Sequence, residues 1–305
     1  MARLGVALGF IASGSGCGQA PQPEPRAVAL DQPFATDLAV DGTSVYWTSD
    51  EGIMSVRVAG ATATALASDN YAHSIAVDAT SVYWVSDSAI MRLPLGGGSP
   101  TTLASGLVLP GGMAVDATSV YWTDAAGVKK APLAGGSPTT LASSQRCTSG
   151  IAVDGTSVYW TEIESVMKVS LAGGPSPPTI LASALSNPGC LAVDATSVYW
   201  TNYGNATSNF NDGSVMKVRL TGGEPITLAS RQPGAWGIAV DATNVYWTNH
   251  GSQDREGSVM RIPLGGGDVT TLFSTGAWNI AVDATSVYWT VYGVGNVAGV
   301  WKVAK

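Results

Sequence analysis

The sequence predicts an all-β protein that is assembled from seven similar repeats. A segment close to VDATSVYWT occurs seven times along the 305 residues. Its tyrosines, which lie 37 to 47 residues apart, are Tyr46, Tyr83, Tyr121, Tyr159, Tyr199, Tyr246 and Tyr288. A period of about 40 residues with many glycines and short apolar runs is typical of β-propeller blades. We therefore predict a seven-bladed β-propeller with four antiparallel strands per blade over residues 26–305.

Each repeat contains four strand candidates separated by turn residues, of the types IAVD, VYWT, SVMKV and TTLAS. The first is small and apolar, which suits the crowded wall of a central channel. The second places Val and Trp on one side and Tyr and Thr on the other, so its large rings can pack against neighbouring blades. We expect a ring of Tyr–Trp pairs to form the core.

The turn between the first and second strands has a constant length. An aspartate precedes the tyrosine by five residues in every repeat, from Asp41 and Tyr46 to Asp283 and Tyr288. Asp followed by Ala or Gly and then Thr forms turns in which the carboxylate accepts hydrogen bonds from the next backbone amides. We therefore interpret these aspartates as structural and not catalytic.

The two ends of the chain are expected to meet in one blade. RAVALDQP at 26–33 has the pattern of an outer strand before the first repeat, whereas the seventh repeat lacks an outer strand after VWKVAK at 300–305. We predict that the N-terminal strand joins the last blade, which closes the ring and removes a sheet edge.

Charged residues are few and widely spread. Six of the seven third strands carry a basic residue after the Met position: Arg92, Lys130, Lys168, Lys217, Arg261 and Lys302. Because radial repetition distributes them around the rim, we interpret them as solvated charges of the scaffold. A net charge of −7 and a pI near 4.7 oppose binding to phosphate backbones, so nucleic acid is not expected as a partner.

One repeat spells Tyr-Trp-Thr-Asp, at residues 121–124, directly after an IAVD-like inner strand. On these residues the chain resembles the YWTD β-propellers of the LDL-receptor class, and the likeness covers residues 26–305. The fourth position differs in the other repeats: Ser49, Ser86, Glu162, Asn202, Asn249 and Val291. Family members have six blades, whereas this chain has seven repeats. The resemblance implies an extracellular binding scaffold, here a bacterial secreted or lipoprotein relative, and implies no particular ligand.

Residues 1–17 have the pattern of an export signal. Arg3 precedes the apolar stretch LGVALGFIA, and small residues lead to Cys17. The arrangement resembles the lipobox of bacterial lipoproteins, which implies lipidation of Cys17 and membrane attachment through it, and the Pro-rich segment 18–25 resembles their tether. Gly14 stands where the lipobox has an aliphatic residue, and a plain secretory signal or a misassigned start are the alternatives. We expect a monomer in the periplasm, on the outer membrane or outside the cell.

The repeats differ most in the loops that follow the second strands of repeats five to seven, at 202–214, 249–257 and 291–299. Rings and amides gather in and beside these loops: Asn202, Tyr203, Phe210, Trp236, Asn249, His250, Trp278 and Tyr292. Rings supply contact area at low entropic cost and amides supply directional hydrogen bonds, so we predict a face that binds a protein, peptide or glycan. The alternative is that the rings plug the wide end of the channel or pack the loops down.

A second functional hypothesis is a hydrolase or lyase that uses the mouth of the channel. Asp37, His73 and Asn279 occupy mouth positions in adjacent blades, and Asp with His is a minimal acid–base or metal-binding pair. Three such residues among fourteen mouth positions are close to chance. We therefore favour binding over catalysis, and assign no catalytic residue, metal or cofactor.

Two cysteines lie in consecutive interblade loops on the face that carries the long loops. Since an exported protein meets oxidising conditions, Cys147 and Cys190 are candidates for a disulfide that ties the fourth blade to the fifth. They lie at different offsets from their repeat aspartates, and the alternative is that their Cα atoms are too far apart to bridge.

Overall fold

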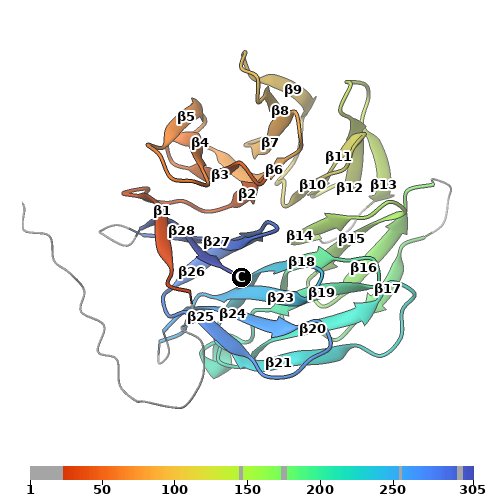
Figure 1. The fold of residues 1–305 in the computed structure, drawn as a ribbon. Helices are drawn as coiled ribbons and strands as arrows, with labels where there is room; N and C mark the ends of the chain where they lie inside the picture. The colour runs from red at the N-terminus through yellow and green to blue at the C-terminus, as the bar shows by residue number, and fades with distance from the viewer. Residues whose placement is uncertain (1–22, 144–146, 173–176, 254–255, 294–297) are drawn as a thin grey trace, which may run out of the picture.

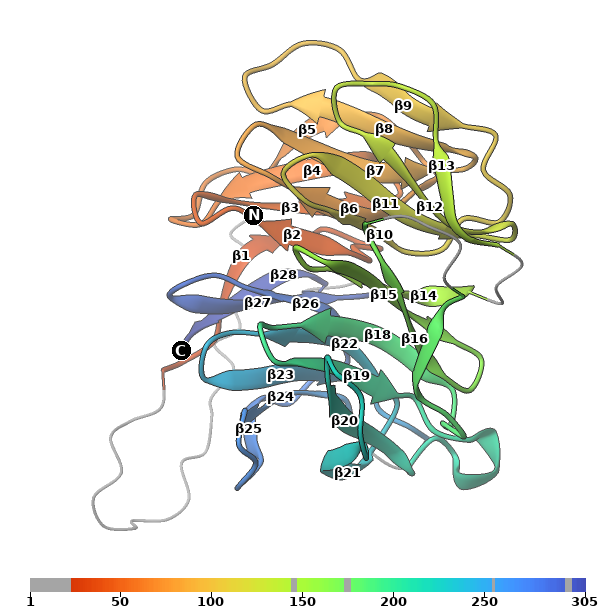
Figure 2. The ribbon, with the colours of Figure 1, turned by 90° about the vertical axis from the view of Figure 1, so that its right-hand side faces the viewer.

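The computed structural model describes residues 23–143, 147–172, 177–253, 256–293 and 298–305, with residues 147–149 described as backbone only. The described residues form seven four-stranded antiparallel sheets that succeed one another around a ring (Figure 1, Figure 2). One short 3₁₀ helix, η1 (Ala206–Ser208), is the only helix in these ranges, and none there is long enough to cross a membrane. The prediction of a seven-bladed propeller is confirmed.

The blades are numbered in chain order. Blade I contains β2 (Leu38–Val40), β3 (Ser44–Ser49), β4 (Gly52–Arg57) and β5 (Thr64–Ala67). Blade II contains β6 (Ala72–Val77), β7 (Ser81–Ser86), β8 (Ala89–Pro94) and β9 (Thr101–Ser105). Blade III contains β10 (Met113–Val115), β11 (Ser119–Asp124), β12 (Gly127–Pro132) and β13 (Thr139–Ser143).

The later blades follow the same order from the centre outwards. Blade IV contains β14 (Cys147–Val153), β15 (Ser157–Glu162), β16 (Val166–Ser170) and β17 (Thr179–Ala182). Blade V contains β18 (Pro188–Val193), β19 (Ser197–Asn202), β20 (Gly213–Arg219) and β21 (Ile226–Gln232). Blade VI contains β22 (Ala235–Val240), β23 (Asn244–Asn249), β24 (Ser258–Pro263) and β25 (Thr270–Phe273). Blade VII contains β26 (Ala277–Val282), β27 (Ser286–Val291), β28 (Gly299–Ala304) and β1 (Arg26–Leu30).

The ring closes through the first strand of the chain. β1, red in Figure 1, lies beside β28, blue, and pairs with it antiparallel, from Arg26 opposite Lys302 to Leu30 opposite Gly299. Gly299 has a φ of 149°, and an added Cβ would overlap the Ala29 carbonyl, so this position requires glycine. The predicted closure is confirmed, and it leaves blade VII with the same four strands as the others.

Seven equivalent clusters of side chains form the core, one at each junction between blades. Each joins the repeat tyrosine of one blade to the repeat tryptophan of the next, as Tyr159 of blade IV joins Trp200 of blade V. All seven tryptophans are at most 1% exposed. A ring of this size buries about 150–250 Å², which stabilises the fold by roughly 4–6 kcal/mol as an upper estimate. The alternation along VYWT sends the two rings to opposite sides of the sheet, as the sequence predicts.

The repeat aspartate joins the turn to the core. In blade III, Asp116 Oδ1 accepts hydrogen bonds from the backbone N–H groups of Thr118 and Ser119 at 2.7 and 2.8 Å, and Oδ2 accepts one from the Tyr121 hydroxyl at 2.7 Å. The same set recurs in all seven blades. Desolvation would raise the pKa of Asp116, but these hydrogen bonds outweigh it and hold the pKa below its ordinary value. The tyrosine contact explains why the spacing of five residues never changes.

Four of the six basic side chains of the third strands bond to the neighbouring blade, which corrects their interpretation as solvated charges for these four. Lys217 Nζ of blade V donates a hydrogen bond to the Leu264 carbonyl of blade VI at 2.5 Å. Equivalent bonds run from Arg92 to the Leu133 carbonyl, from Lys168 to the Leu220 carbonyl and from Lys302 to the Val58 carbonyl. The ammonium groups of Lys168 and Lys302 also lie over the repeat tyrosine rings of their own blades, at 5.4 and 5.8 Å from the centroids.

Candidate functional site

The long loops of blades V to VII lie at one end of the strands, together with the interblade loops. The Gly234 N–H, between β21 and β22, donates a hydrogen bond to the Phe210 carbonyl in the β19–β20 loop at 2.9 Å. The His250 N–H, in the β23–β24 loop, donates one to the Gly234 carbonyl, also at 2.9 Å. Three segments from two blades are therefore held together by backbone hydrogen bonds.

Side chains of these loops and the adjacent strands form one continuous run of rings, which we call the aromatic cluster. Its members in contact order are Phe210, Tyr203, Trp236, His250, Trp278, Tyr292 and Phe34. The centroids of successive rings lie 4.1 to 5.7 Å apart, which is the range of favourable aromatic pairs. The cluster reaches from blade V to the β1–β2 connection.

The structure thus brings together the six ring residues that the sequence singled out and adds Phe34. Phe34 packs edge-on against Tyr292 at 5.4 Å, with a φ of 60° that is unusual for a bulky residue. It lies before the first repeat, where no equivalent position in another repeat draws attention to it. Its only signal in the sequence is a large apolar residue in the connection to the first inner strand.

The rings are packed against one another and also reach the surface. Tyr292 is 46% exposed, and the other members are partly buried. They pack the loops together and leave an aromatic surface on the same end of the propeller. The two interpretations of the sequence, a binding face and a loop-packing plug, both stay predictions.

His250 lies at the middle of the aromatic cluster. Its ring stacks on Trp278 with centroids 4.1 Å apart and an angle of 14° between the planes. Desolvation lowers the pKa of His250 to about 4, and a hydrogen bond with the Trp278 backbone only partly offsets this effect. Its Nε2 atom is buried and has no hydrogen-bond partner within the described ranges. The imidazole is therefore neutral at pH 7 and acts as a flat ring.

Asn202 and Asn249 lie below the surface, whereas the sequence predicts them at a ligand-binding face. Both are buried, with 4% and 1% exposure. Asn202 Oδ1 accepts a hydrogen bond from the Trp200 indole at 3.2 Å, and Asn249 Nδ2 donates one to Gln232 Oε1, which also accepts the Trp247 indole. Both amides therefore belong to the hydrogen-bond networks of buried tryptophans.

The fourth position of the repeat has this role in other blades as well. Asp124 and Glu162 accept hydrogen bonds from the indoles of Trp122 and Trp160. In blade VII the position is Val291, and the buried indole nitrogen of Trp289 has no partner in the part of the chain that the structure describes. The fourth position therefore supplies the indole acceptor in blades III, IV and V, whereas Trp84 and Trp247 bond to Asp69 and Gln232.

At the mouth of the channel, Asp37 contacts Asn279 but has no free oxygen. Oδ1 accepts hydrogen bonds from the Leu38 N–H and from Asn279 Nδ2, and Oδ2 accepts one from the Ile75 N–H at 2.9 Å. Desolvation raises the pKa of Asp37 to about 6, against the lowering effects of the backbone hydrogen bonds and the charge of His73. These contacts connect the inner strands of blades VII, I and II.

His73 is held apart from that pair by backbone oxygens. Its Nδ1 and Nε2 lie 3.2 and 3.3 Å from the carbonyl oxygens of Tyr71 and Pro110. Within the described ranges, no three His, Cys, Asp or Glu side chains are grouped so that they could hold a metal ion. Asp37 and Asn279 therefore connect neighbouring blades, and the acid–base site stays a prediction.

The cysteine predictions fall partly outside the described structure. Cys17 lies outside the described residues, and of Cys147 only the backbone is described. Cys190 lies in β18 and has no disulfide partner among the described side chains; as a thiol, its pKa is raised to about 12 by desolvation and by the charge of Asp37. The bridge between Cys147 and Cys190 stays a prediction, and the Cys190 thiol is a poor nucleophile in this state.

No family model and no curated protein matches the chain. Among solved structures, a chain of the nidogen/laminin complex aligns with a TM-score of 0.55 and 22% identity, over 69% of this chain and 85% of that one. PorZ, an essential surface component of the type IX secretion system of Porphyromonas gingivalis, aligns with a TM-score of 0.64 and 15% identity, over 87% of this chain but only 36% of its own. BamB from Moraxella catarrhalis aligns with a TM-score of 0.57 and 17% identity, over 90% and 86%. At these identities the likeness is one of fold.

Proposed function

We propose that this protein is an exported binding module whose recognition surface is the aromatic cluster of blades V to VII. The observation that carries the proposal is the continuous run of rings, which six separate segments of the chain assemble on one end of the propeller. The rest of the fold repeats with a period near 40 residues, whereas this surface does not repeat. Binding residues are commonly placed on such loops above a rigid scaffold.

The chemistry of the cluster favours a neutral ligand with a flat or apolar face. Its histidine is uncharged at pH 7, and the two ion pairs found within the described ranges, at Asp124 and Asp241, involve none of its members. Aromatic rings bind sugar rings and apolar side chains through their faces. A glycan or an extended peptide with apolar side chains therefore fits the surface better than a highly charged ligand.

The structural relatives support interaction and export. One is seen in a complex with laminin, and another is a bacterial surface component of a secretion system. We propose that this chain is likewise an extracytoplasmic interaction protein of the YWTD type. Residues 1–17 would direct its export, Cys17 would carry a lipid, and residues 18–25 would tether the propeller. Intact mass of the membrane-associated and soluble protein, compared for wild type and Cys17→Ser, tests the lipid, which Cys17→Ser should abolish.

A glycan and peptide array tests the recognition surface. The probes are the wild type, the double variant Trp236→Ala with Trp278→Ala, and Tyr71→Ala as a matched control. Tyr71 is a 72% exposed aromatic residue in an interblade loop of another sector, before β6. Ligands that bind the wild type and Tyr71→Ala but not the double variant support the proposal. A double variant that keeps every ligand would refute it, and unfolding as severe as that of a core tryptophan variant would favour the plug.

A further inference from the structure

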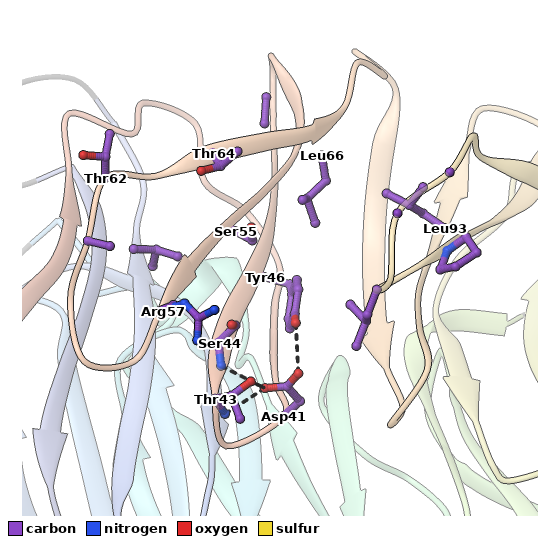
Figure 3. A pocket seen from close by; sticks show the side chains of 17 residues that line it. Asp41, Thr43, Ser44, Tyr46, Ser55, Arg57, Thr62, Thr64, Leu66 and Leu93 are labelled. Atoms are coloured by element: carbon purple, nitrogen blue, oxygen red, sulfur yellow. Dashed lines mark hydrogen bonds between the residues drawn. The ribbon is translucent and has the colours of Figure 1, made fainter.

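A groove of about 580 Å³ opens between blades I and II (Figure 3). It includes the β2–β3 turn, which lies at the end of the strands opposite to the β3–β4 turn and the interblade loops. The β2–β3 turn with Asp41 and Tyr46 forms one wall, β4 contributes Ser55 and Arg57, and residues 93–98 of blade II form the other wall. Figure 3 shows the Tyr46 hydroxyl pointing at the Asp41 carboxylate inside this groove. The wall residues belong to the repeats, so the groove can be compared with its equivalents.

The groove lies beside the third strand of blade I, which lacks the basic residue that the other six third strands carry. Ser55 is the residue opposite Tyr46, whereas Lys217 lies opposite Tyr199 in blade V and reaches the Leu264 carbonyl of blade VI. Leu95 is the counterpart of Leu264, because both donate their N–H to the threonine carbonyl of the preceding turn. A serine is too short to cross this distance, so no side chain of blade I among the described residues bonds to the Leu95 carbonyl.

Another junction shows what the aspartate–tyrosine pair can bind. Lys305 of blade VII places its ammonium 2.6 Å from Asp241 Oδ2 and 5.5 Å from the centroid of the Tyr246 ring. Asp241 and Tyr246 are the blade VI equivalents of Asp41 and Tyr46, with the same hydroxyl-to-carboxylate hydrogen bond. Within one molecule, this pair therefore already holds an alkylammonium group.

The junction between blades I and II has neither source of an ammonium. Lys305 occupies the position that is Leu95 in blade II, since both donate their N–H to the equivalent threonine carbonyl. Ser55 and Leu95 thus replace the two kinds of basic residue that occupy this place at other junctions. What remains is a carboxylate, a tyrosine ring and a carbonyl oxygen around an open groove, with the exposed Arg57 side chain at its rim.

We propose that this groove binds a primary alkylammonium group supplied from outside the chain, either a lysine side chain of a partner or a free polyamine. The ammonium donates hydrogen bonds to Asp41 Oδ2 and the Leu95 carbonyl and lies over the Tyr46 ring, as the ammonium of Lys305 lies over Tyr246. The alkyl chain lies along the apolar side chains of Leu66 and Leu93 in the groove wall.

Titration of the full-length chain with 1,5-diaminopentane tests the proposal, followed by the backbone amide signals of residues 43–46 and 95–98. The expected dissociation constant is in the millimolar range, since one exposed charge pair and one cation–π contact contribute little. 1-Pentanol is the control for purely apolar binding and should cause no shifts in these signals. The peptide acetyl-Gly-Lys-Gly-amide distinguishes the sources: tighter binding of the peptide identifies a protein lysine, and tighter binding of the diamine a polyamine.

Two reciprocal variants locate the site. Ser55→Lys supplies the missing side chain and should weaken diamine binding at least tenfold without lowering the unfolding temperature. Lys217→Ser opens the equivalent junction and should create a second set of shifts, at residues 196–199 and 264–266. Unchanged binding by Ser55→Lys, equal binding of 1-pentanol, or no binding of either amine would overturn the proposal.

A variant of Arg57, at the rim of the groove, tests whether the groove prefers a cation. Arg57 is exposed and lines the groove, so its charge opposes a cation. Arg57→Ala should tighten diamine binding about two- to fivefold at low salt, and the gain should shrink at high salt because exposed charges are screened. Loss of diamine binding in Arg57→Ala would mean that the Arg57 side chain helps to form the site instead of repelling the cation, which contradicts the proposal.

Discussion

Blades IV and V have equivalent cores and differ in the loop between their second and third strands. In blade IV the chain turns within a few residues between β15 and β16, closed by a hydrogen bond from the Glu162 N–H to the Ser165 carbonyl. In blade V the same connection spans 203–212 and contains η1. The flanking clusters are nonetheless equivalent, with Trp160 and Trp200 both fully buried. The scaffold and the surface are therefore specified by separate residues, and a loop can grow without disturbing the junction between blades.

The largest expected effect tests whether the two cores are equal. Trp160→Ala and Trp200→Ala should each lower the free energy of unfolding by about 3–5 kcal/mol, because each leaves a cavity the size of an indole. Urea unfolding of the two variants provides the measurement. A difference between them above about 1 kcal/mol would mean that the blade V loop supports its core, and the comparison would fail.

The fold was predictable because its information is repeated. The seven aligned repeats predict the same strands and the same turn, so a repeat with an unusual residue can be interpreted from the other six. The closure follows from the outer strand that the seventh repeat lacks. The burial of Asn202 was not predictable, because its hydrogen bond depends on the direction in which the Trp200 indole points, which the pattern does not show. The bridging role of Lys217 depends on the distance between blades, which the sequence does not contain either. The sequence shows that Ser55 stands where the other six third strands have Lys or Arg. Only the structure shows that a groove opens at this place.

The next effect concerns the turn that both blades share. Asp154→Ala and Asp194→Ala should each cost about 2 kcal/mol of unfolding free energy, since each removes the turn hydrogen bonds and the partner of a buried tyrosine hydroxyl. Hydrogen bonds outweigh desolvation and lower the pKa of both aspartates in the folded state. Their stabilisation is therefore present above about pH 4 and is lost as the pH falls below that value.

Urea unfolding at pH 7 and pH 3 measures this effect. Wild type and variants should differ at pH 7, and the difference should narrow at pH 3, equally for the two blades. A gap that is unchanged at pH 3 would show that the carboxylate charge is not what stabilises the turn. A gap confined to one blade would show that the surrounding loops, and not the turn, decide the contribution.

A smaller effect distinguishes the elaborated sector from the rest. Because the pKa of His250 is lowered to about 4, the unfolded chain binds its proton more readily, and stability is lost as the pH falls from about 6.5 towards 4. Asp37, with its pKa raised to about 6, acts with the opposite sign in an overlapping window, so the wild type alone is not informative. His250→Phe keeps a flat ring and removes the proton. Between pH 7.5 and pH 5, the free energy of unfolding of the variant should rise relative to that of the wild type by on the order of 1 kcal/mol, as measured by urea unfolding. A pH-independent difference would mean that His250 is accessible to water.

The smallest expected effect on stability is the one that bears most directly on function. Tyr292 is 46% exposed at the end of the aromatic cluster, so Tyr292→Ala should change the unfolding temperature by only about 1–2 °C, against far larger shifts for the buried tryptophans. Differential scanning calorimetry of Tyr292→Ala and the control Tyr71→Ala gives the comparison. Similar small shifts mean that the outer rings are available for a ligand. A loss for Tyr292→Ala that approaches that of Trp200→Ala would instead make the cluster part of the core, and blades V to VII would differ from blades I to IV in packing and not in recognition.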